Sequence, residues 1–184
     1  MFEKEDYLKW DDLFMSLAKL IALRSKDPAT QVGAIIVDKN NKILSLGYNG
    51  APNGFDDIDF PWAKSGDVLH TKFPFVCHAE LNAITNYNGD REKFENSTLY
   101  VTLFLCNECA KIIIQSGIKN VVYSYIKNEE RPLVQAAKIL FDKCNVNYKE
   151  YKLDEDIIIP SDGAAYIDYK CYIKERKLNK KDHK

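Results

Sequence analysis

The sequence predicts an α/β protein, a three-layer α/β/α fold with a mixed central sheet of about five strands. Three observations lead to this prediction. An apolar stripe with helical spacing occupies residues 7–23. Two apolar runs separated by a short turn follow within residues 31–49 and predict a hairpin. From residue 78 onward helical and strand patterns alternate, which requires parallel crossovers with helices packed on both faces of a sheet.

The first part of the chain holds one helix, two strands and a long irregular segment. The helix predicted over 7–23 ends before Pro28, because a residue that precedes proline disfavours the helical region. Strands are predicted at 31–38 and 41–49. Residues 50–76 have no periodicity and contain three prolines and three glycines. A long irregular insertion in a compact domain is typically a lid or a binding loop.

The second part alternates helices with strands. Helices are predicted at 78–87, 107–116 and 132–141, and strands at 97–104, 119–125 and 146–153. Gly117 is a typical helix stop, and Pro132 is suited to a first helical turn. Beyond residue 154 the pattern is ambiguous between short strands and a loosely packed extension.

Composition excludes several classes of protein. The chain has 184 residues, 46% of them hydrophobic and 29% charged, and a formal net charge of −1. No apolar run approaches the roughly 20 residues of a membrane span, and the acidic N-terminus lacks the apolar core of a signal peptide. We therefore expect a cytoplasmic protein with no membrane partner. The near-neutral charge makes a polynucleotide partner unlikely, although residues 174–184 form a basic tail with six basic and two acidic side chains.

Two short motifs, each at the start of a predicted helix, carry the chemistry. His78-Ala79-Glu80 opens one helix and Cys106-Asn107-Glu108-Cys109 opens the next. One imidazole and two thiolates form the ligand set of a catalytic zinc ion that keeps a position for water. The spacing of Cys106 and Cys109 places both sulfurs on one side of a helix N-terminus, which stabilises thiolates. A C-x-x-C motif alone is equally typical of redox or structural sites.

Glu80 gives the predicted zinc site a proton acceptor. A carboxylate two residues from a ligand, but not itself a ligand, can take a proton from the attacking water and deliver it to the leaving group. An H-x-E motif followed by C-x-x-C is the signature of the zinc nucleobase deaminases. The remaining cysteines are predicted to be packing residues, namely Cys77, Cys144 and Cys171. His70 is predicted to be a loop residue.

Longer segments extend this match. Residues 24–34 (RSKDPATQVGA), 47–54 (GYNGAPNG) and 105–123 (LCNECAKIIIQSGIKNVVY) resemble the deoxycytidylate deaminases of the zinc-dependent cytidine and deoxycytidylate deaminase superfamily. The resemblance covers about residues 5–150. It implies a cytidine deaminase-like fold, one catalytic Zn²⁺ per subunit and hydrolysis of dCMP to dUMP and ammonia. Leu105 departs from the family, which usually has proline before the first cysteine.

The resemblance also assigns residues and domains. His78, Cys106 and Cys109 match the zinc ligands, Glu80 the proton shuttle and Asn49 the residue that meets the sugar, although an Asn in a tight turn needs no ligand. It implies a zinc deaminase domain at 1–154, with 50–76 as a regulatory or lid loop, and a C-terminal extension at 155–184. Ala79 is a further candidate for substrate binding. The candidates for binding the substrate phosphate are Arg24, Ser25, Lys26 and Tyr125. An alternative role for Arg24 is to cap the preceding helix.

Regulation and assembly also follow from the resemblance. The family's Gly-Tyr-Asn-Gly region is associated with nucleotide triphosphates, dCTP activating and dTTP inhibiting. Here this region comprises Gly47, Tyr48, Asn49 and Gly50. Family members are commonly hexameric, which implies a homo-oligomer. Two alternative functions stay open: a deaminase that acts on a nucleoside or polynucleotide, and a catalytically weak zinc-binding scaffold.

Overall fold

A computed structural model of the chain describes residues 8–153, 159–160 and 166–167. The chain divides into two compact units, residues 1–152 and 153–184. In the second unit, strand β6 (Ile159–Pro160) pairs antiparallel with β7 (Tyr166–Ile167). The predicted basic tail lies outside the described residues. Among the helices that are described, none is long and apolar enough to cross a membrane.

The first unit contains the predicted α/β alternation. Its helices are α1 (Trp10–Ala22), α2 (Ala79–Thr85), α3 (Asn107–Ser116) and α4 (Pro132–Lys143). Its strands are β1 (Gly33–Val37), β2 (Ile43–Tyr48), β3 (Thr98–Val101), β4 (Asn120–Tyr123) and β5 (Asn147–Glu150). Each element lies where the sequence predicts it, with ends that differ by a few residues. Two short 3₁₀ turns, Val68–His70 and Arg91–Phe94, were not predicted.

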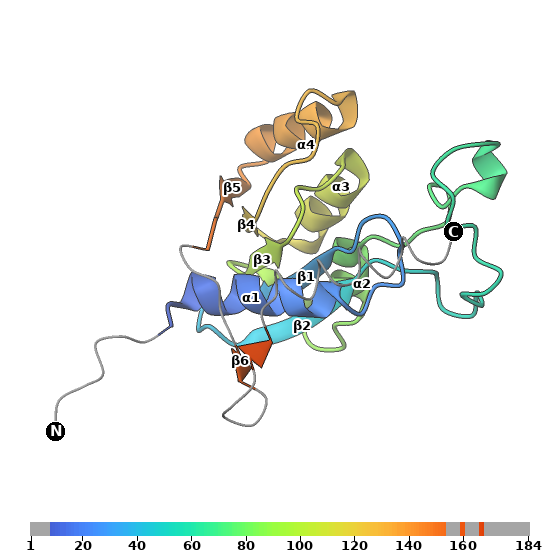
Figure 1. Cartoon of the computed structure of the whole chain (residues 1–184). Helices are drawn as coiled ribbons and strands as arrows, with labels where there is room; N and C mark the ends of the chain where they lie inside the picture. The colour runs from blue at the N-terminus through green and yellow to red at the C-terminus, as the bar shows by residue number, and fades with distance from the viewer. Residues whose placement is uncertain (1–7, 154–158, 161–165, 168–184) are drawn as a thin grey trace, which may run out of the picture. The chain divides into compact units, whose positions relative to one another are not determined.

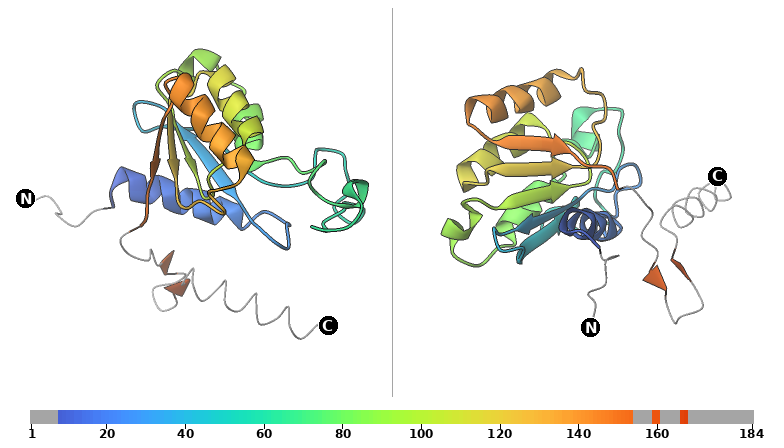
Figure 2. Two further views of the ribbon diagram at one scale, coloured as in Figure 1. Left: turned by 90° about the horizontal axis from the view of Figure 1, so that it is seen from above. Right: turned by 90° about the vertical axis from the view of Figure 1, so that its left-hand side faces the viewer.

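The five strands form one mixed sheet in the order β2-β1-β3-β4-β5. Strand β1 runs antiparallel to both neighbours, whereas β3, β4 and β5 are parallel to one another. Helix α1 lies on one face of the sheet, and α2, α3 and α4 lie on the other (Figures 1 and 2). This arrangement confirms the predicted three-layer fold.

The sheet has an apolar core on each face. On the α1 face, Phe14 and Met15 are buried, and the ring of Phe14 packs on Tyr100 of β3. On the other face, Ile36 of β1 and Leu99 of β3 join Ile113 of α3 in the larger cluster. The alternation of side chains along β1 serves both cores, which is why this central strand is buried at every position.

The strand directions determine where a site can form. Because β1 is antiparallel to β2 and to β3, the carboxyl ends of β2, β3 and β4 meet at one edge of the sheet. Asn49 follows β2, the loop with Cys106 follows β3, and Tyr125 lies just beyond β4. Ligands of α/β proteins bind outside the carboxyl ends of strands, so the functional site is expected at this edge of the sheet.

Strand β2 approaches α2 unusually closely. A Cβ atom on Gly47 would lie 2.3 Å from the Ala83 backbone nitrogen and 2.4 Å from the Ala79 carbonyl oxygen. The side chains of Asn82 and Asn86 donate hydrogen bonds to the carbonyl oxygens of Tyr48 (2.7 Å) and Leu46 (3.1 Å), which hold the two elements together. Gly47 therefore has a packing role that the sequence did not indicate. Its predicted part in nucleotide regulation stays a prediction.

The close approach of Gly47 to α2 leads to a prediction about stability. Gly47→Ala is expected to lower the free energy of unfolding by about 3 kcal/mol, the upper end of what overpacking costs, because the obstructing atoms are backbone. The matched control is Gly50→Ala, whose new Cβ would meet only Tyr48 Cε2 at 3.9 Å and should change stability by less than about 0.5 kcal/mol. Denaturant unfolding measures both. Equal stabilities for the two variants would contradict the packing role.

Candidate metal centre

The three predicted ligands converge at the starts of two helices. His78 is the N-cap residue of α2, Cys106 is the N-cap residue of α3, and Cys109 lies in the first turn of α3. His78 Nδ1 lies 3.2 Å from Cys109 Sγ and 3.5 Å from Cys106 Sγ. All three donor atoms lie within 4.8 Å of one another, and this is the one such group of His, Cys, Asp and Glu found among the described residues.

The spacing of these atoms fits zinc. With Zn–S near 2.3 Å and Zn–N near 2.0–2.1 Å, donors at the corners of a tetrahedron lie about 3.6–3.8 Å apart. The distances from Nδ1 to the two sulfurs are close to that range. Two sulfurs and one imidazole nitrogen also match zinc chemically. Leu105 is buried in the core immediately before Cys106, so the absence of proline there does not displace the first thiolate from the cluster.

The three predicted ligand side chains shift one another's pKa values. A hydrogen bond from Cys109, assisted by one from His78, lowers the pKa of Cys106 to about 3 despite its burial. The hydrogen bond to Cys106 raises the pKa of His78 to about 9, and the nearby charge of Lys72 opposes that rise. The hydrogen bond to Cys106 and burial raise the pKa of Cys109. A metal ion that binds here displaces these protons.

Glu80 is buried beside the cluster. Its side chain belongs to the first turn of α2, is 3% exposed and hydrogen-bonds with Cys109. Burial raises the pKa of the Glu80 carboxyl, against the opposite effect of the His78 charge. A carboxyl group whose pKa is raised toward neutrality is suited to accept and return a proton. The structure thus places the predicted proton shuttle next to the predicted ligands.

Asn49 lies at the same edge of the sheet and is buried. Its Nδ2 donates to Asp27 Oδ2 (3.1 Å) and to the Thr30 carbonyl oxygen (3.0 Å). Its Oδ1 accepts from the Val32 backbone N–H at 2.8 Å. Both amide donors are therefore used within the protein, and a lone pair on Oδ1 remains for a ligand.

The other predicted substrate residues have different surroundings. Arg24 is exposed, and its backbone N–H closes the end of α1 by bonding to the Ile21 carbonyl oxygen (2.9 Å). Ser25 is buried, and its Oγ accepts from the Asp27 backbone N–H (3.3 Å). Lys26 is exposed and paired with Asp57. These surroundings do not test the predicted contact with the phosphate, which stays a prediction for Arg24, Ser25 and Lys26.

Two further predicted residues adjoin the ligand loops. Ala79 is buried as the first residue of α2, directly after His78. The Tyr125 carbonyl oxygen accepts from the Phe104 backbone N–H at 2.8 Å, which places Tyr125 beside the loop that carries Cys106, while its side chain is 44% exposed. The predicted substrate contacts of Ala79 and Tyr125 stay predictions.

The irregular segment 50–76 is closed at its base beside the centre. Gly50 and Cys77 exchange two backbone hydrogen bonds of 2.9 and 3.0 Å, so the two ends of the segment meet next to His78. The segment projects from the sheet (Figure 2, left) and packs its own aromatic side chains, with the rings of Phe60 and Trp62 4.4 Å apart. Trp62 thus packs within this segment.

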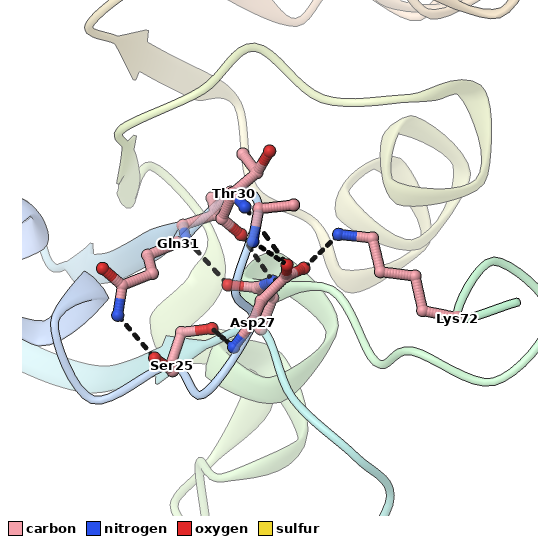
Figure 3. Close-up of polar contacts among 8 residues, drawn as sticks. Ser25, Asp27, Thr30, Gln31 and Lys72 are labelled. Carbon is pink, nitrogen blue, oxygen red and sulfur yellow. Dashed lines mark hydrogen bonds and ion pairs between the residues drawn. The ribbon is translucent and has the colours of Figure 1, made fainter. Parts of the chain in front are cut away.

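Sequence reasoning missed two charged residues near the centre. Asp27 and Lys72 form a buried ion pair next to Asn49 (Figure 3). Asp27 precedes a proline, where an aspartate has an ordinary turn function, and Lys72 is one lysine in a segment without periodicity. No local pattern distinguishes a buried lysine from an exposed one, so only the three-dimensional structure identifies this pair.

Comparison with known proteins agrees with this geometry. Residues 8–125 match the model of the cytidine and deoxycytidylate deaminase zinc-binding region. The chain is 48% identical to the deoxycytidylate deaminase of Homo sapiens over 168 residues, 91% of this chain and 89% of the human protein. It is 44% identical to the probable deoxycytidylate deaminase of Drosophila melanogaster over 179 residues, 94% of this chain and 84% of the fly protein.

The fold also matches a solved deaminase. The crystal structure of dCMP deaminase from the cyanophage S-TIM5 in complex with dCMP and dUMP has a TM-score of 0.61, is 27% identical, and covers 79% of this chain and 100% of the phage chain. The matched region is a zinc-binding one, and the described residues contain a His/Cys/Cys group placed to hold one ion, so the cofactor is a single zinc. The chain belongs to the cytidine and deoxycytidylate deaminase family.

Proposed function

We propose that this chain hydrolyses dCMP to dUMP and ammonia, and so supplies dUMP for thymidylate synthesis. The observation that carries the proposal is the buried Glu80 beside the convergent His78, Cys106 and Cys109. The near-50% identity to deoxycytidylate deaminases over most of the chain supports dCMP as the substrate. Retention of Glu80 favours an enzyme over a zinc-binding scaffold, because a scaffold needs no proton acceptor beside the ligands.

The proposed mechanism uses each group for one task. His78, Cys106 and Cys109 hold the zinc ion, which when bound lowers the pKa of water and so supplies a nucleophile at neutral pH. Glu80 accepts a proton from the water that attacks C4 of cytosine and donates it to N3. Glu80 then transfers the second water proton to the amino group, the C4–N bond breaks, and ammonia leaves. The C4 carbonyl of uracil takes the place of the amino group.

Substrate contacts complete the proposal. Asn49 Oδ1 accepts a hydrogen bond from the sugar hydroxyl, using the lone pair that Val32 leaves free. The backbone N–H of Ala79, among the first N–H groups of α2 that have no helical acceptor, donates to the cytosine ring. Arg24, whose charged group is exposed, is the better supported candidate for the phosphate, ahead of Ser25, Lys26 and Tyr125.

A substrate panel tests the function. Ammonia release is measured with dCMP, dCTP, cytidine and single-stranded DNA at equal concentrations and equal zinc content. We expect dCMP to be preferred over cytidine by at least about 100-fold in kcat/KM, since a site built to bond the phosphate strongly rejects an analogue that lacks it. We expect dCTP and single-stranded DNA to be turned over more slowly than dCMP as well. Turnover of another substrate, with dCMP untouched, would replace this function by a nucleoside or polynucleotide deaminase. Zinc binding without any turnover would favour the scaffold.

Regulation, assembly and location belong to the same proposal. We infer that dCTP activates and dTTP inhibits through Gly47, Tyr48, Asn49 and Gly50, a region joined to the base of segment 50–76 by the Gly50–Cys77 pairing. The exposed apolar side chains of that segment support contact between copies, as in a hexamer: Phe55, Ile58, Val68, Leu69 and Phe73. Free cysteines are typical of a reducing compartment, which supports the cytoplasm.

A further inference from the structure

Asp27 and Lys72 form an ion pair that is shielded from solvent. Their side chains are 1% and 8% exposed, whereas in every other ion pair of the described residues at least one side chain is more than half exposed. Asp27 lies in the loop between α1 and β1, and Lys72 near the end of segment 50–76 (Figure 3). Burying two charges is costly, and an apolar pair often serves stability as well, so this pair calls for a role beyond stability.

Asp27 is one of three groups that fix how the Asn49 carboxamide is turned, together with the Thr30 carbonyl oxygen and the Val32 backbone N–H. Asp27 Oδ1 accepts from the backbone N–H groups of Ala29 (2.8 Å) and Thr30 (3.1 Å). Its Oδ2 accepts from Asn49 Nδ2 (3.1 Å) and from Lys72 Nζ. The two ends of a carboxamide have nearly the same shape, so packing cannot choose between them. A flipped amide would place Asn49 Oδ1 against the Asp27 carboxylate and its NH₂ group against the Val32 N–H, and both contacts are repulsive.

Lys72 connects the Asp27–Asn49 contact to the turn that precedes His78. The Lys72 carbonyl oxygen accepts from the Phe75 and Val76 backbone N–H groups at 3.1 and 2.8 Å, which forms a tight turn. Cys77, the next residue, pairs with Gly50, and Gly50 directly follows Asn49. The Lys72 side chain therefore contacts Asn49 through Asp27, and the Lys72 backbone belongs to the turn that leads to Cys77, the residue before His78.

We propose that Asp27 and Lys72 are positioning residues of the deaminase site. The pair fixes the Asn49 carboxamide so that Oδ1 is available to the substrate sugar. It also connects the turn before His78 to Asn49. This inference rests on the proposed function, in which Asn49 contacts the sugar. Lys72 compensates the buried charge of Asp27, and Asp27 supplies the charged acceptor among the three groups that orient the amide.

The test is whether the pair acts through Asn49. Lys72→Met is expected to lower kcat/KM for dCMP by about 10–100-fold, the size of effects from outer groups that orient a ligand, mainly through KM and with zinc content unchanged. Asn49→Ala is expected to lower it at least as much. In the Asn49→Ala/Lys72→Met double variant the two losses should not multiply, because Lys72 has no amide left to position. Losses that multiply would overturn the proposal.

Two further variants guard against a folding defect. Lys72→Arg keeps the charge and should retain most of the activity. Asp27→Asn/Lys72→Met leaves no unpaired buried charge, so it should fold, yet it should also raise KM because Asn49 Nδ2 loses its charged acceptor and keeps only the backbone partners Thr30 and Val32. The matched control is Lys149→Met, which removes the exposed Lys149–Asp11 pair and should leave kcat/KM unchanged. Wild-type KM in the Asp27→Asn/Lys72→Met variant would also overturn the proposal.

One readout does not depend on activity. In ¹⁵N–¹H spectra of the zinc-loaded protein, the Asn49 side-chain NH₂ signals are assigned by their absence in Asn49→Ala. In the wild type, where both donors are bonded, they should exchange slowly with solvent, and Lys72→Met should accelerate that exchange by at least about tenfold. Unchanged exchange would overturn the positioning role. If the wild type does not turn over dCMP, the proposed function fails, and the exchange measurement still decides whether the pair positions Asn49.

Discussion

Glu80→Gln is expected to lower the turnover of dCMP by about 10²–10⁴-fold, the range that general acid–base groups contribute, with no loss of zinc. Glutamine has nearly the same shape as glutamate but cannot accept a proton from water or pass one to N3. Glu80 is not one of the three clustered ligand residues, so zinc binding should survive. Ammonia release measures turnover, and atomic absorption measures zinc per chain.

Glu108→Gln is the control for Glu80. Glu108 lies between the two cysteines of the same motif, but its side chain is exposed and paired with Lys111. Loss of its charge should leave both zinc content and turnover close to the wild-type values. If Glu80→Gln retained turnover, Glu80 would not be the proton shuttle. If Glu80→Gln lost zinc, Glu80 would have to be a ligand or a direct support of one.

Cys109→Ala should abolish both zinc binding and turnover. Changes to groups that merely support a ligand weaken metal affinity by about 10–100-fold, so removal of a ligand should cost at least about 100-fold. After dialysis against a chelator, zinc per chain should fall close to zero and ammonia release should reach background. Cys109 is 2% exposed, and removal of its small sulfur atom should cost only about 1 kcal/mol of stability, so the fold should persist in circular dichroism spectra.

Cys144→Ala is the matched control for Cys109→Ala. Cys144 is a half-buried free cysteine at the C-terminal end of α4 and does not belong to the metal cluster. Its removal should leave one zinc per chain and wild-type turnover. Full zinc content in Cys109→Ala would show that His78 and Cys106 recruit a different third ligand and would contradict the proposed ligand set.

Elements whose signals are local could be predicted from the sequence. Helix α3 begins and ends where expected, since Gly117 adopts the left-handed conformation (φ 90°) that favours glycine at a helix end. The metal cluster was predictable for a similar reason. His78 and Cys106 are helix N-cap residues, and two helix starts at the same sheet edge bring their side chains together once the strand directions are known.

Features that depend on contacts between distant residues were predicted less well. The sequence predicts Gly47 as part of a regulatory turn, but its lack of a side chain also lets Ala79 and Ala83 of α2 approach closely. Arg24, Ser25 and Lys26 are adjacent in sequence and stay predicted phosphate candidates, but only the structure reveals that Ser25 is buried and that Lys26 pairs with Asp57. Adjacent residues of a loop point in different directions, so a sequence run does not establish a shared binding surface.

The sequence by itself was enough to predict the layered α/β fold, and it supplied His78, Cys106 and Cys109 as candidate ligands with Glu80 beside them. The fold follows from short-range periodicity, and the candidate residues follow from two motifs at helix starts. Only the tertiary structure revealed the Asp27–Lys72 pair and its contact with Asn49. Asp27 and Lys72 are separated by 45 positions, and whether a lysine is buried depends on which distant carboxylate it contacts. That meeting depends on how segment 50–76 folds back at Gly50 and Cys77, a long-range contact for which the sequence contains no periodic signal.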